Sequence, residues 1–262
     1  MTLRTKVVIV TVALFFLFFA FTDRELTAYG VWRLTGSGTL ALSISPSTSL
    51  AFAIGDHYFN AKGSGVYDLS KAQTYYEKTL ELDPSQPLAR YQLARIDFLK
   101  GHFDTALIKT NKQIELHGDN PQSTYYLRAL IYGYSKQFKE AEKDFLKFIA
   151  WKPNSWAAHN DLAWVYFQQG EYQKSFAIAQ EGLIHNPGNA WLLNSEGIAL
   201  LNLGRFTEAA KILTEARLAA GNLHEEDWQR AYPGNDPRVA SGALQKMREA
   251  IDLNLSLATL HK

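Results

Sequence analysis

The sequence predicts an all-α protein made of helix–turn–helix units that repeat along the chain, preceded by one transmembrane helix. Three observations lead to this fold class. Residues 156–187 contain two amphipathic helix patterns joined by a short turn at Gly170. A period of 34 residues separates small residues at equivalent places, as between Ala209 and Ala243. Ahead of the repeats stands the charge-free run Val7–Thr22.

Composition limits the class of protein. The chain has 262 residues, of which 47% are apolar, so a largely disordered chain is excluded. Its 27 basic and 26 acidic residues leave a net charge of +1, and no global field favours nucleic acid as a partner. The absence of cysteine excludes disulfides, thiolate zinc sites, iron–sulfur clusters and a lipid anchor on cysteine.

The charge-free run Val7–Thr22 follows two basic residues, Arg4 and Lys6. Its 16 residues would span about 24 Å as a helix, slightly short of a bilayer core of about 30 Å, and Lys6 can snorkel. We expect residues 1–22 to be a signal anchor with the N-terminus in the cytoplasm and the repeats on the extracytoplasmic side. A cleaved signal peptide is the first alternative, with a poor cleavage site at 20–22, and a buried core helix is the second.

The rest of the chain divides by its glycines, prolines and period. Residues 23–47 are interpreted as a juxtamembrane connector, in which Leu40–Ile44 fits a short strand or part of a helix. Residues 224–262 are expected to form a degenerate sixth unit with a C-terminal capping helix, because Pro233 and Pro237 interrupt its first helix. Between them, residues 48–223 hold five units, at about 48–86, 87–120, 122–155, 156–189 and 190–223.

The unit at 156–189 resembles the tetratricopeptide repeat (TPR). The residues that carry the resemblance are Leu162-Ala163, Tyr166, Gly170 with Tyr172, Ser175 and Pro187. It extends over about residues 48–257, with departures such as Lys136 in place of the turn glycine of the third unit. The resemblance implies a right-handed α-solenoid whose first helices line a concave groove for a protein or peptide ligand.

No pattern of catalytic residues accompanies the repeats. The seven histidines lack the spacing of metal ligands, and the glycines at 63 and 65 lack the lysine of a phosphate-binding loop. The acidic run 225–227 fits the start of a helix, where it favours the helix dipole. We therefore expect no enzyme, no catalytic residue, no metal and no cofactor.

The helical phase of the first helices, together with the resemblance, predicts the residues that face the groove. The predicted partner-binding residues are Tyr91, Arg95, Phe98, Tyr126, Tyr134, Asn160, Trp164, Phe167, Gln168, Trp191 and Asn194. Further positions on the same face are Phe52, Asp56, Phe59, Asn60 and Asn202. The aromatic content favours apolar or aromatic ligand side chains, and Asn160 and Asn194 are expected to hold a peptide backbone. The alternative is that Trp164 and Phe98 only pack between neighbouring repeats.

The predicted function is that of a membrane-anchored, non-enzymatic scaffold. It would be held in the membrane by residues 7–22 and would bind a protein or peptide partner in the groove, in the setting of an envelope assembly or secretion complex. One alternative is a soluble secreted or periplasmic TPR binding module that remains after signal-peptide cleavage. Another is an accessory subunit of an enzyme complex, or a transferase fused to repeats. Nucleic acid is not an expected partner.

Overall fold

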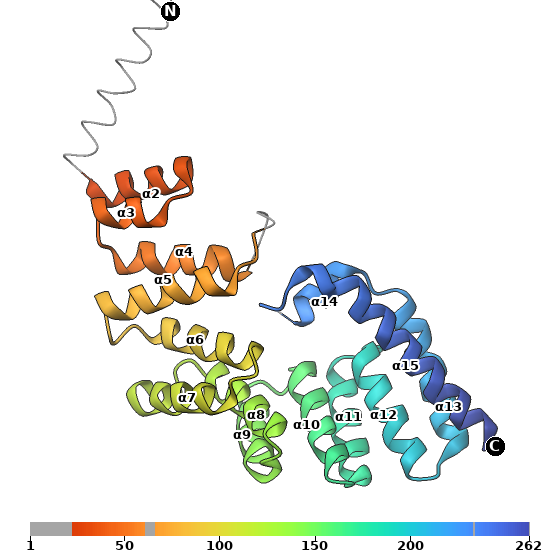
Figure 1. The fold of residues 1–262 in the computed structure, drawn as a ribbon. Helices are drawn as coiled ribbons and strands as arrows, with labels where there is room; N and C mark the ends of the chain where they lie inside the picture. The colour runs from red at the N-terminus through yellow and green to blue at the C-terminus, as the bar shows by residue number, and fades with distance from the viewer. Residues whose placement is uncertain (1–22, 61–65, 233, 262) are drawn as a thin grey trace, which may run out of the picture. The chain divides into compact units, whose positions relative to one another are not determined.

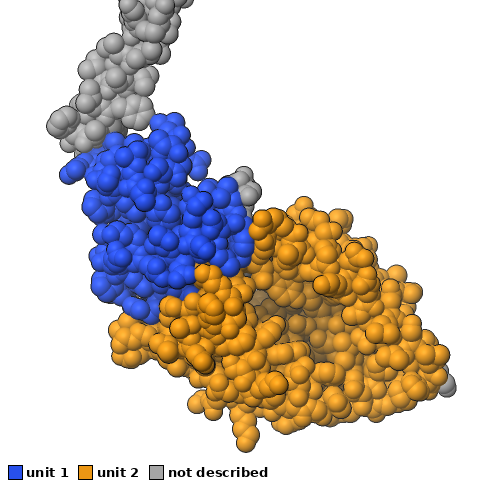
Figure 2. All heavy atoms as spheres, viewed as in Figure 1, with its two compact units in different colours: residues 1–93 blue, residues 94–262 orange. Residues whose placement is uncertain are grey.

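The computed structural model describes residues 23–60, 66–232 and 234–261. In these residues the chain forms fourteen α-helices and one short 3₁₀ helix, with no strand (Figure 1). The expected all-helical, TPR-like fold is therefore confirmed for the described part of the chain. The chain divides into two compact units, residues 1–93 and 94–262, which are coloured separately in Figure 2.

The described part of the first unit begins with a pair of short helices, α2 (Arg24–Thr35) and α3 (Gly38–Ile44). Asp23 caps the start of α2 and Ser37 caps α3, each by accepting a hydrogen bond from a backbone N–H of the first turn. Ala28 and Trp32, four residues apart, place one face of α2 in a shared apolar core. The sequence predicts a connector over residues 23–47, whereas the structure has a helical pair there, because these caps allow helices between the glycines.

The pair α4 (Thr48–Asn60) and α5 (Leu69–Leu82) follows in the first unit. Gly55 lets the two helices approach closely, since a Cβ at this position would lie 2.8 Å from the ring of Tyr76. The Tyr76 hydroxyl donates a hydrogen bond of 2.5 Å to Asp56. Helix α6 (Pro87–Leu99) comes next and contains the boundary between the two units.

The second unit continues as a series of packed helix pairs (Figure 1). Each helix from α7 to α12 packs against the next, and α15 packs on α13. The helices are α7 (Phe103–His117), α8 (Ser123–Tyr134), α9 (Phe138–Trp151), α10 (Trp156–Gln168), α11 (Tyr172–His185), α12 (Ala190–Asn202), α13 (Phe206–Gly221), α14 (Glu225–Ala231), η1 (Pro237–Val239) and α15 (Ala240–Leu260). Each predicted repeat from 122 to 223 contains one pair of these helices, and 224–262 contains α14, η1 and α15.

The turns inside the pairs share one backbone geometry. In each, the N–H of the residue after the turn donates to the carbonyl five residues earlier, which satisfies an otherwise free carbonyl at the end of the first helix. These bonds run from His102 to Asp97 (2.8 Å), Gln137 to Tyr132 (2.8 Å), Glu171 to Tyr166 (2.9 Å) and Arg205 to Leu200 (3.0 Å). The residue before the donor has a positive φ: 77° at Gly101, 61° at Lys136, 75° at Gly170 and 74° at Gly204. Lys136 thus adopts the conformation that glycine supplies elsewhere.

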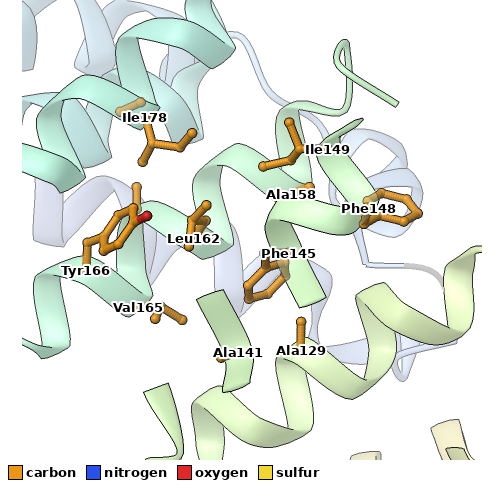
Figure 3. Packing of buried hydrophobic residues seen from close by; sticks show 12 residues of the cluster. Ala129, Ala141, Phe145, Phe148, Ile149, Ala158, Leu162, Val165, Tyr166 and Ile178 are labelled. Carbon is orange, nitrogen blue, oxygen red and sulfur yellow. The ribbon is translucent and has the colours of Figure 1, made fainter. Parts of the chain in front are cut away.

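The core of the second unit fills the space between successive helix pairs. Phe145 on α9 and Leu162 on α10 are completely buried and lie in one cluster with Tyr166 and Ile178 (Figure 3). Small residues bring the helices close: the Ser175 hydroxyl donates 2.9 Å to the carbonyl oxygen of Ala163 across the α10–α11 pair. Burial of each large apolar side chain contributes roughly 1.5–3 kcal/mol, so this continuous cluster is the main support for the helices that carry the candidate site.

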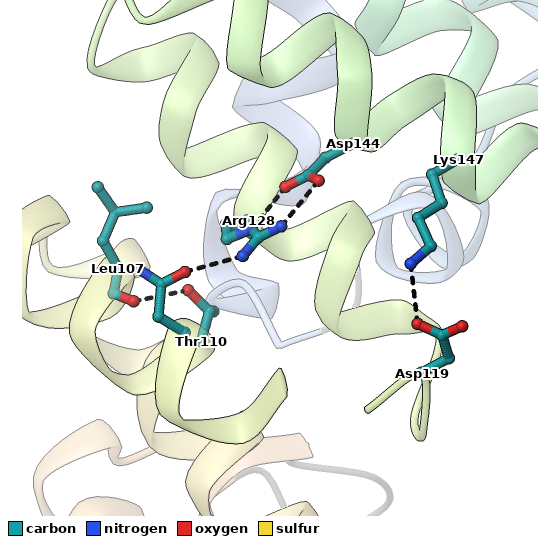
Figure 4. A network of polar contacts seen from close by, with 7 residues as sticks. Leu107, Thr110, Asp119, Arg128, Asp144 and Lys147 are labelled. Carbon is teal, nitrogen blue, oxygen red and sulfur yellow. Dashed lines mark hydrogen bonds and ion pairs between the residues drawn. The ribbon is translucent and has the colours of Figure 1, made fainter. Parts of the chain in front are cut away.

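A buried ion pair joins α8 to α9. Arg128 donates from Nε to Asp144 at 2.6 Å and from Nη2 to the other carboxylate oxygen at 2.9 Å, and Nη1 donates to Asn111 on α7 at 2.8 Å (Figure 4). The bidentate geometry and the near-complete burial of Asp144 fix the relative rotation of these helices. Burial lowers the pKa of Arg128, but the hydrogen bonds and charge of Asp144 outweigh it, and the pKa lies above its usual value.

The predicted single-pass membrane topology is contradicted. No helix in the described residues combines the length and the apolar character needed to cross a membrane. All of these helices except α15 have 16 residues or fewer, and α15 has 21 but carries four charges, at Lys246, Arg248, Glu249 and Asp252. The predicted orientation, with a cytoplasmic N-terminus and extracytoplasmic repeats, depends on that topology and is contradicted with it. The run predicted to span the membrane, residues 7–22, lies outside the described residues.

Candidate functional site

The candidate site lies on the first helices of three successive pairs, α8, α10 and α12. Helix α10 contacts both of the others. Tyr126, Asn160 and Asn194 occupy equivalent positions on them, 34 residues apart. In Figure 2 the surface of the second unit is hollowed where these helices face α14. We define the inner face as Tyr126, Tyr134, Asn160, Asp161, Trp164, Trp191, Asn194 and Ser195.

A line of hydrogen bonds crosses the inner face from helix to helix. The Tyr126 hydroxyl on α8 donates to the carboxylate of Asp161 on α10. The Asn160 amide donates to the same carboxylate at 3.2 Å, and its oxygen accepts from the Ser195 hydroxyl on α12 at 3.0 Å. These bonds hold the polar side chains of three helices in one arrangement, as a preformed binding surface requires.

Asp161 is the chemically distinctive group of the inner face. Burial raises the pKa of its carboxyl from 3.8 to about 6, and the hydrogen bonds from Tyr126 and Asn160 act in the opposite direction. Within the described part of the chain, no lysine, arginine or histidine forms an ion pair with it. The side chain oxygen of Asn194 is likewise buried and accepts no hydrogen bond from a described residue. The inner face therefore offers acceptors that the fold itself does not use.

Aromatic rings form one side of the inner face. Tyr134, at the end of α8, is 55% exposed, and its ring lies 5.0 Å from Trp164, 5.4 Å from Phe98 and 6.1 Å from Phe103, measured between centroids. Trp164 packs over Gly133, where a Cβ would lie only 2.9 Å from the indole. Phe98 and Trp164 thus make the packing contacts that the alternative interpretation expects, yet both keep part of their surface exposed.

The other side of the inner face is built around Trp191. Its indole stacks on Trp156, with centroids 4.9 Å apart and an interplanar angle of 25°. Tyr232, which follows α14, meets Trp191 edge to face at 6.3 Å. Burial raises the pKa of the Tyr232 hydroxyl, and the charge of Asp161 raises it further, while a hydrogen bond from Trp191 lowers it. Tyr232 therefore lies close to the carboxylate, although it comes from the last, degenerate unit.

Asp161 and Tyr232 were not among the residues predicted from sequence. A signal existed for Asp161, because it precedes Trp164 by three residues, which places the two on the same helix face. No comparable signal existed for Tyr232, since its approach to Trp191 depends on how the chain turns after the interrupted helix α14.

Several predicted residues of the second unit lie at the edge of the inner face or elsewhere. Phe167 contacts Tyr172 at 5.4 Å, in the turn of its own pair. Gln168 is exposed, and Asn202 donates to the carbonyl of Ile198 in its own helix at 2.9 Å. Arg95, on α6, is partly exposed.

The remaining predicted positions belong to the first unit, which is described by itself. Tyr91 and Asn60 are partly exposed there, and Phe52 packs against Tyr76 at 5.4 Å. Asp56 accepts hydrogen bonds from Tyr76 and from Gln92. The placement of Phe59 on the groove face is wrong: the side chain is completely buried, because it follows Ala51 and Gly55 at intervals of four along the core face of α4.

Cavities elsewhere in the molecule do not coincide with the inner face. One of about 350 Å³ lies in the first unit beside Tyr75, and one of about 250 Å³ lies between the start of α14 and Arg248. No cluster of three metal-ligating side chains occurs in residues 23–60, 66–232 and 234–261.

Comparison with known proteins supports the repeat assignment. The tetratricopeptide repeat family model matches residues 126–190, which include α8 to α11. No curated protein matches the chain. The fold is similar to that of the MamA protein, with a TM-score of 0.56 and 23% identity over 71% of this chain and 94% of that one.

Two further solved structures share the fold. YrrB, described as a TPR protein with an unusual peptide-binding site, has a TM-score of 0.55 and 17% identity, over 70% of this chain and 92% of its own. PilW, described as a widely conserved type IV pilus biogenesis factor, has a TM-score of 0.60 and 16% identity, over 82% of this chain and 90% of its own. At these identities the likeness shows the fold alone.

Proposed function

We propose that this protein is a non-enzymatic scaffold that binds a protein or peptide partner on the inner face of its second unit. The observation that carries the proposal is the set of groups on this face that the fold does not use. They are the carboxylate of Asp161 without a cationic partner, the buried oxygen of Asn194 without a donor, and the exposed ring of Tyr134. Such groups serve recognition better than stability.

The rigidity of the site supports the same proposal. The inner face is made of helices, and its polar residues are bonded across α8, α10 and α12 by Tyr126, Asn160 and Ser195. A partner therefore does not have to order these side chains when it binds, which lowers the entropic cost of association. YrrB, a protein of the same fold that is described as having an unusual peptide-binding site, is consistent with this use of the repeats.

Site-specific photo-crosslinking on the full chain tests the proposal. A benzophenone amino acid at Tyr134, which is 55% exposed on the inner face, is compared with the same group at Ile184, which is 77% exposed on α11. We expect a discrete covalent adduct from position 134, competed by excess unlabelled protein, and none from position 184. Adducts from position 184 alone would overturn the assignment to the inner face.

The partner identified by mass spectrometry can then be purified and titrated calorimetrically. Truncation of an interface anchor costs about 2 kcal/mol or more, so Trp191→Ala should weaken binding at least about tenfold. Ile184→Ala is the matched control and should leave the affinity unchanged. The setting of this interaction in an envelope assembly or secretion complex, and the alternative role as an enzyme accessory subunit, stay predictions.

A further inference from the structure

We propose that the inner face recognises an arginine side chain of its partner, with the carboxylate of Asp161 as the counter-charge and the rings of Tyr134, Trp164 and Trp191 as its walls, a role that rests on the proposed function. Charge complementarity, free hydrogen-bond acceptors and aromatic stacking support this role.

The first step is charge complementarity. An enclosed carboxylate is expensive unless a cation or several donors compensate it. The second unit follows this rule at two other aspartates, since Asp97 pairs with Lys109 and Asp144 pairs with Arg128. Asp161 has two neutral donors, Tyr126 and Asn160, and no cation within the described part of the chain. The missing charge can therefore be supplied by the ligand.

Glu196 is the instructive contrast. It is a buried carboxylate without an ion pair, and burial raises its pKa. However, it accepts a hydrogen bond from Gln180 on α11, and the charges that act on it come from Arg205, Glu208 and Glu215, at the α13 side of the pair. It faces into the repeat stack, whereas Asp161 lies beside the aromatic residues of the inner face.

The second step is the number of free acceptors. An ionised carboxylate has about four acceptor positions, and Tyr126 and Asn160 occupy two of those of Asp161. The unused oxygen of Asn194, on the adjacent helix, adds a further acceptor. A guanidinium has five N–H donors in one plane and can reach acceptors on two helices, which suits this set better than the compact ammonium of lysine.

The third step is the aromatic surroundings. Tyr134 and Trp164 lie 5.0 Å apart on one side, and Trp191 lies on the other, with Tyr232 next to it. Cations already lie over other rings of this unit, such as Lys147 over Tyr125 and Arg205 over Phe176. No described lysine or arginine lies over Tyr134, Trp164 or Trp191. These faces are available for a planar guanidinium, and such stacking is worth about 0.5–2 kcal/mol.

The test uses a small probe on the full chain. N-acetyl-arginine N-methylamide is titrated into the protein with labelled tryptophans, and the indole N–H signals are followed by NMR. The citrulline analogue is the matched neutral probe, since it keeps the shape and loses the charge. We expect saturable shifts of the Trp164 and Trp191 signals with arginine, and at least about tenfold weaker binding of citrulline. Equal binding of the two probes would overturn the proposal.

Two variants complete the design. Asp161→Asn should remove the preference for arginine over citrulline, while Glu196→Gln, which changes the other unpaired carboxylate, should keep it. An unchanged preference in Asp161→Asn would refute the role of Asp161. A lysine probe that binds as tightly as arginine would refute the selection of a guanidinium. If Asp161→Asn folds poorly, the comparison of arginine with citrulline on the unaltered protein still decides.

Failure of this inference is separable from failure of the proposed function. Photo-crosslinking at Tyr134 with no discrimination between arginine and citrulline would leave the inner face as the binding surface and remove the arginine site. Absence of any adduct at Tyr134 would instead remove the proposed function, whatever the probe shows.

Discussion

The hydroxyl of Tyr126 on α8 donates to the carboxylate of Asp161 on α10, 35 residues further along the chain. This bond crosses from one repeat to the next, while the ring of Tyr126 also packs against Phe145 of the apolar core, with centroids 5.7 Å apart. It also opposes the effect of burial on Asp161, whose pKa would lie even further above its usual value without it. The chemical state of the inner face therefore depends on contacts between repeats.

The change Tyr126→Phe tests this dependence. Loss of the hydroxyl donor should raise the pKa of Asp161 from about 6 by roughly a unit, because a hydrogen bond to a charged group contributes about 1.5–3 kcal/mol and part of it is recovered by rearrangement. An NMR titration of the Asp161 carboxyl carbon measures the effect. Tyr172→Phe, in the turn of the α10–α11 pair, is the control and should leave this titration in place. An unchanged Asp161 titration in Tyr126→Phe would show that the bond is not made in solution.

The change Asp161→Asn should alter how stability depends on pH. Because the folded-state pKa of Asp161 is raised, its contribution to stability is fully present below the unfolded value of 3.8 and is lost as pH rises through about 6. The neutral amide does not suffer this loss, so the variant should gain stability relative to the parent at pH 8 and not at pH 3.5. A shift of about two units corresponds to at most about 3 kcal/mol, and partial exposure of the residue reduces it.

Urea unfolding at pH 3.5, 5, 6 and 8 measures this difference. The two neighbouring tyrosines, Tyr134 and Tyr232, do not titrate between pH 3.5 and 8. Burial and the charge of Asp161 raise the pKa of both hydroxyls, so they stay neutral in this range. A stability difference between variant and parent that is the same at all four pH values would contradict the raised pKa.

The ion pair between Arg128 and Asp144 should contribute far more to stability than the one between Lys147 and Asp119. Both pairs are seen in Figure 4, but Asp144 is only 2% exposed, whereas Asp119 lies at the surface. Asp144→Ala leaves the Arg128 guanidinium without its charged partner and should cost about 3 kcal/mol. Lys147→Ala should change the free energy of unfolding little, since exposed pairs are screened by water. Similar losses in the two variants, measured by urea unfolding, would be inconsistent with the burial difference.

Sequence periodicity predicted the repeat architecture, because this architecture depends on local features such as turn glycines and small residues at helix contacts. Gly170 and Ser175 have the same role in the sequence pattern and in the structure, as a turn glycine and a close helix contact. The candidate site was less predictable, because part of the environment of Asp161 comes from distant residues such as Tyr126, 35 positions away, and Tyr232. Phe59 shows the limit of a prediction from helical phase. It was assigned to the groove face, but it lies four residues after Gly55 on the core face of α4 and is completely buried.

Among the described residues, Lys136 is the non-glycine residue with a positive φ, which makes its turn a place to measure backbone strain. Its turn has the same hydrogen bond as the turns at Gly101, Gly170 and Gly204, so the fold imposes the left-handed conformation on a residue with a Cβ. Relief of this strain by Lys136→Gly should raise the free energy of unfolding by about 1 kcal/mol. Gly170→Lys places the same strain in the next turn and should lower it by a similar amount. Thermal unfolding of the two variants and the parent measures these differences in stability. A loss of stability in Lys136→Gly would mean that the lysine side chain makes a stabilising contact that outweighs the strain.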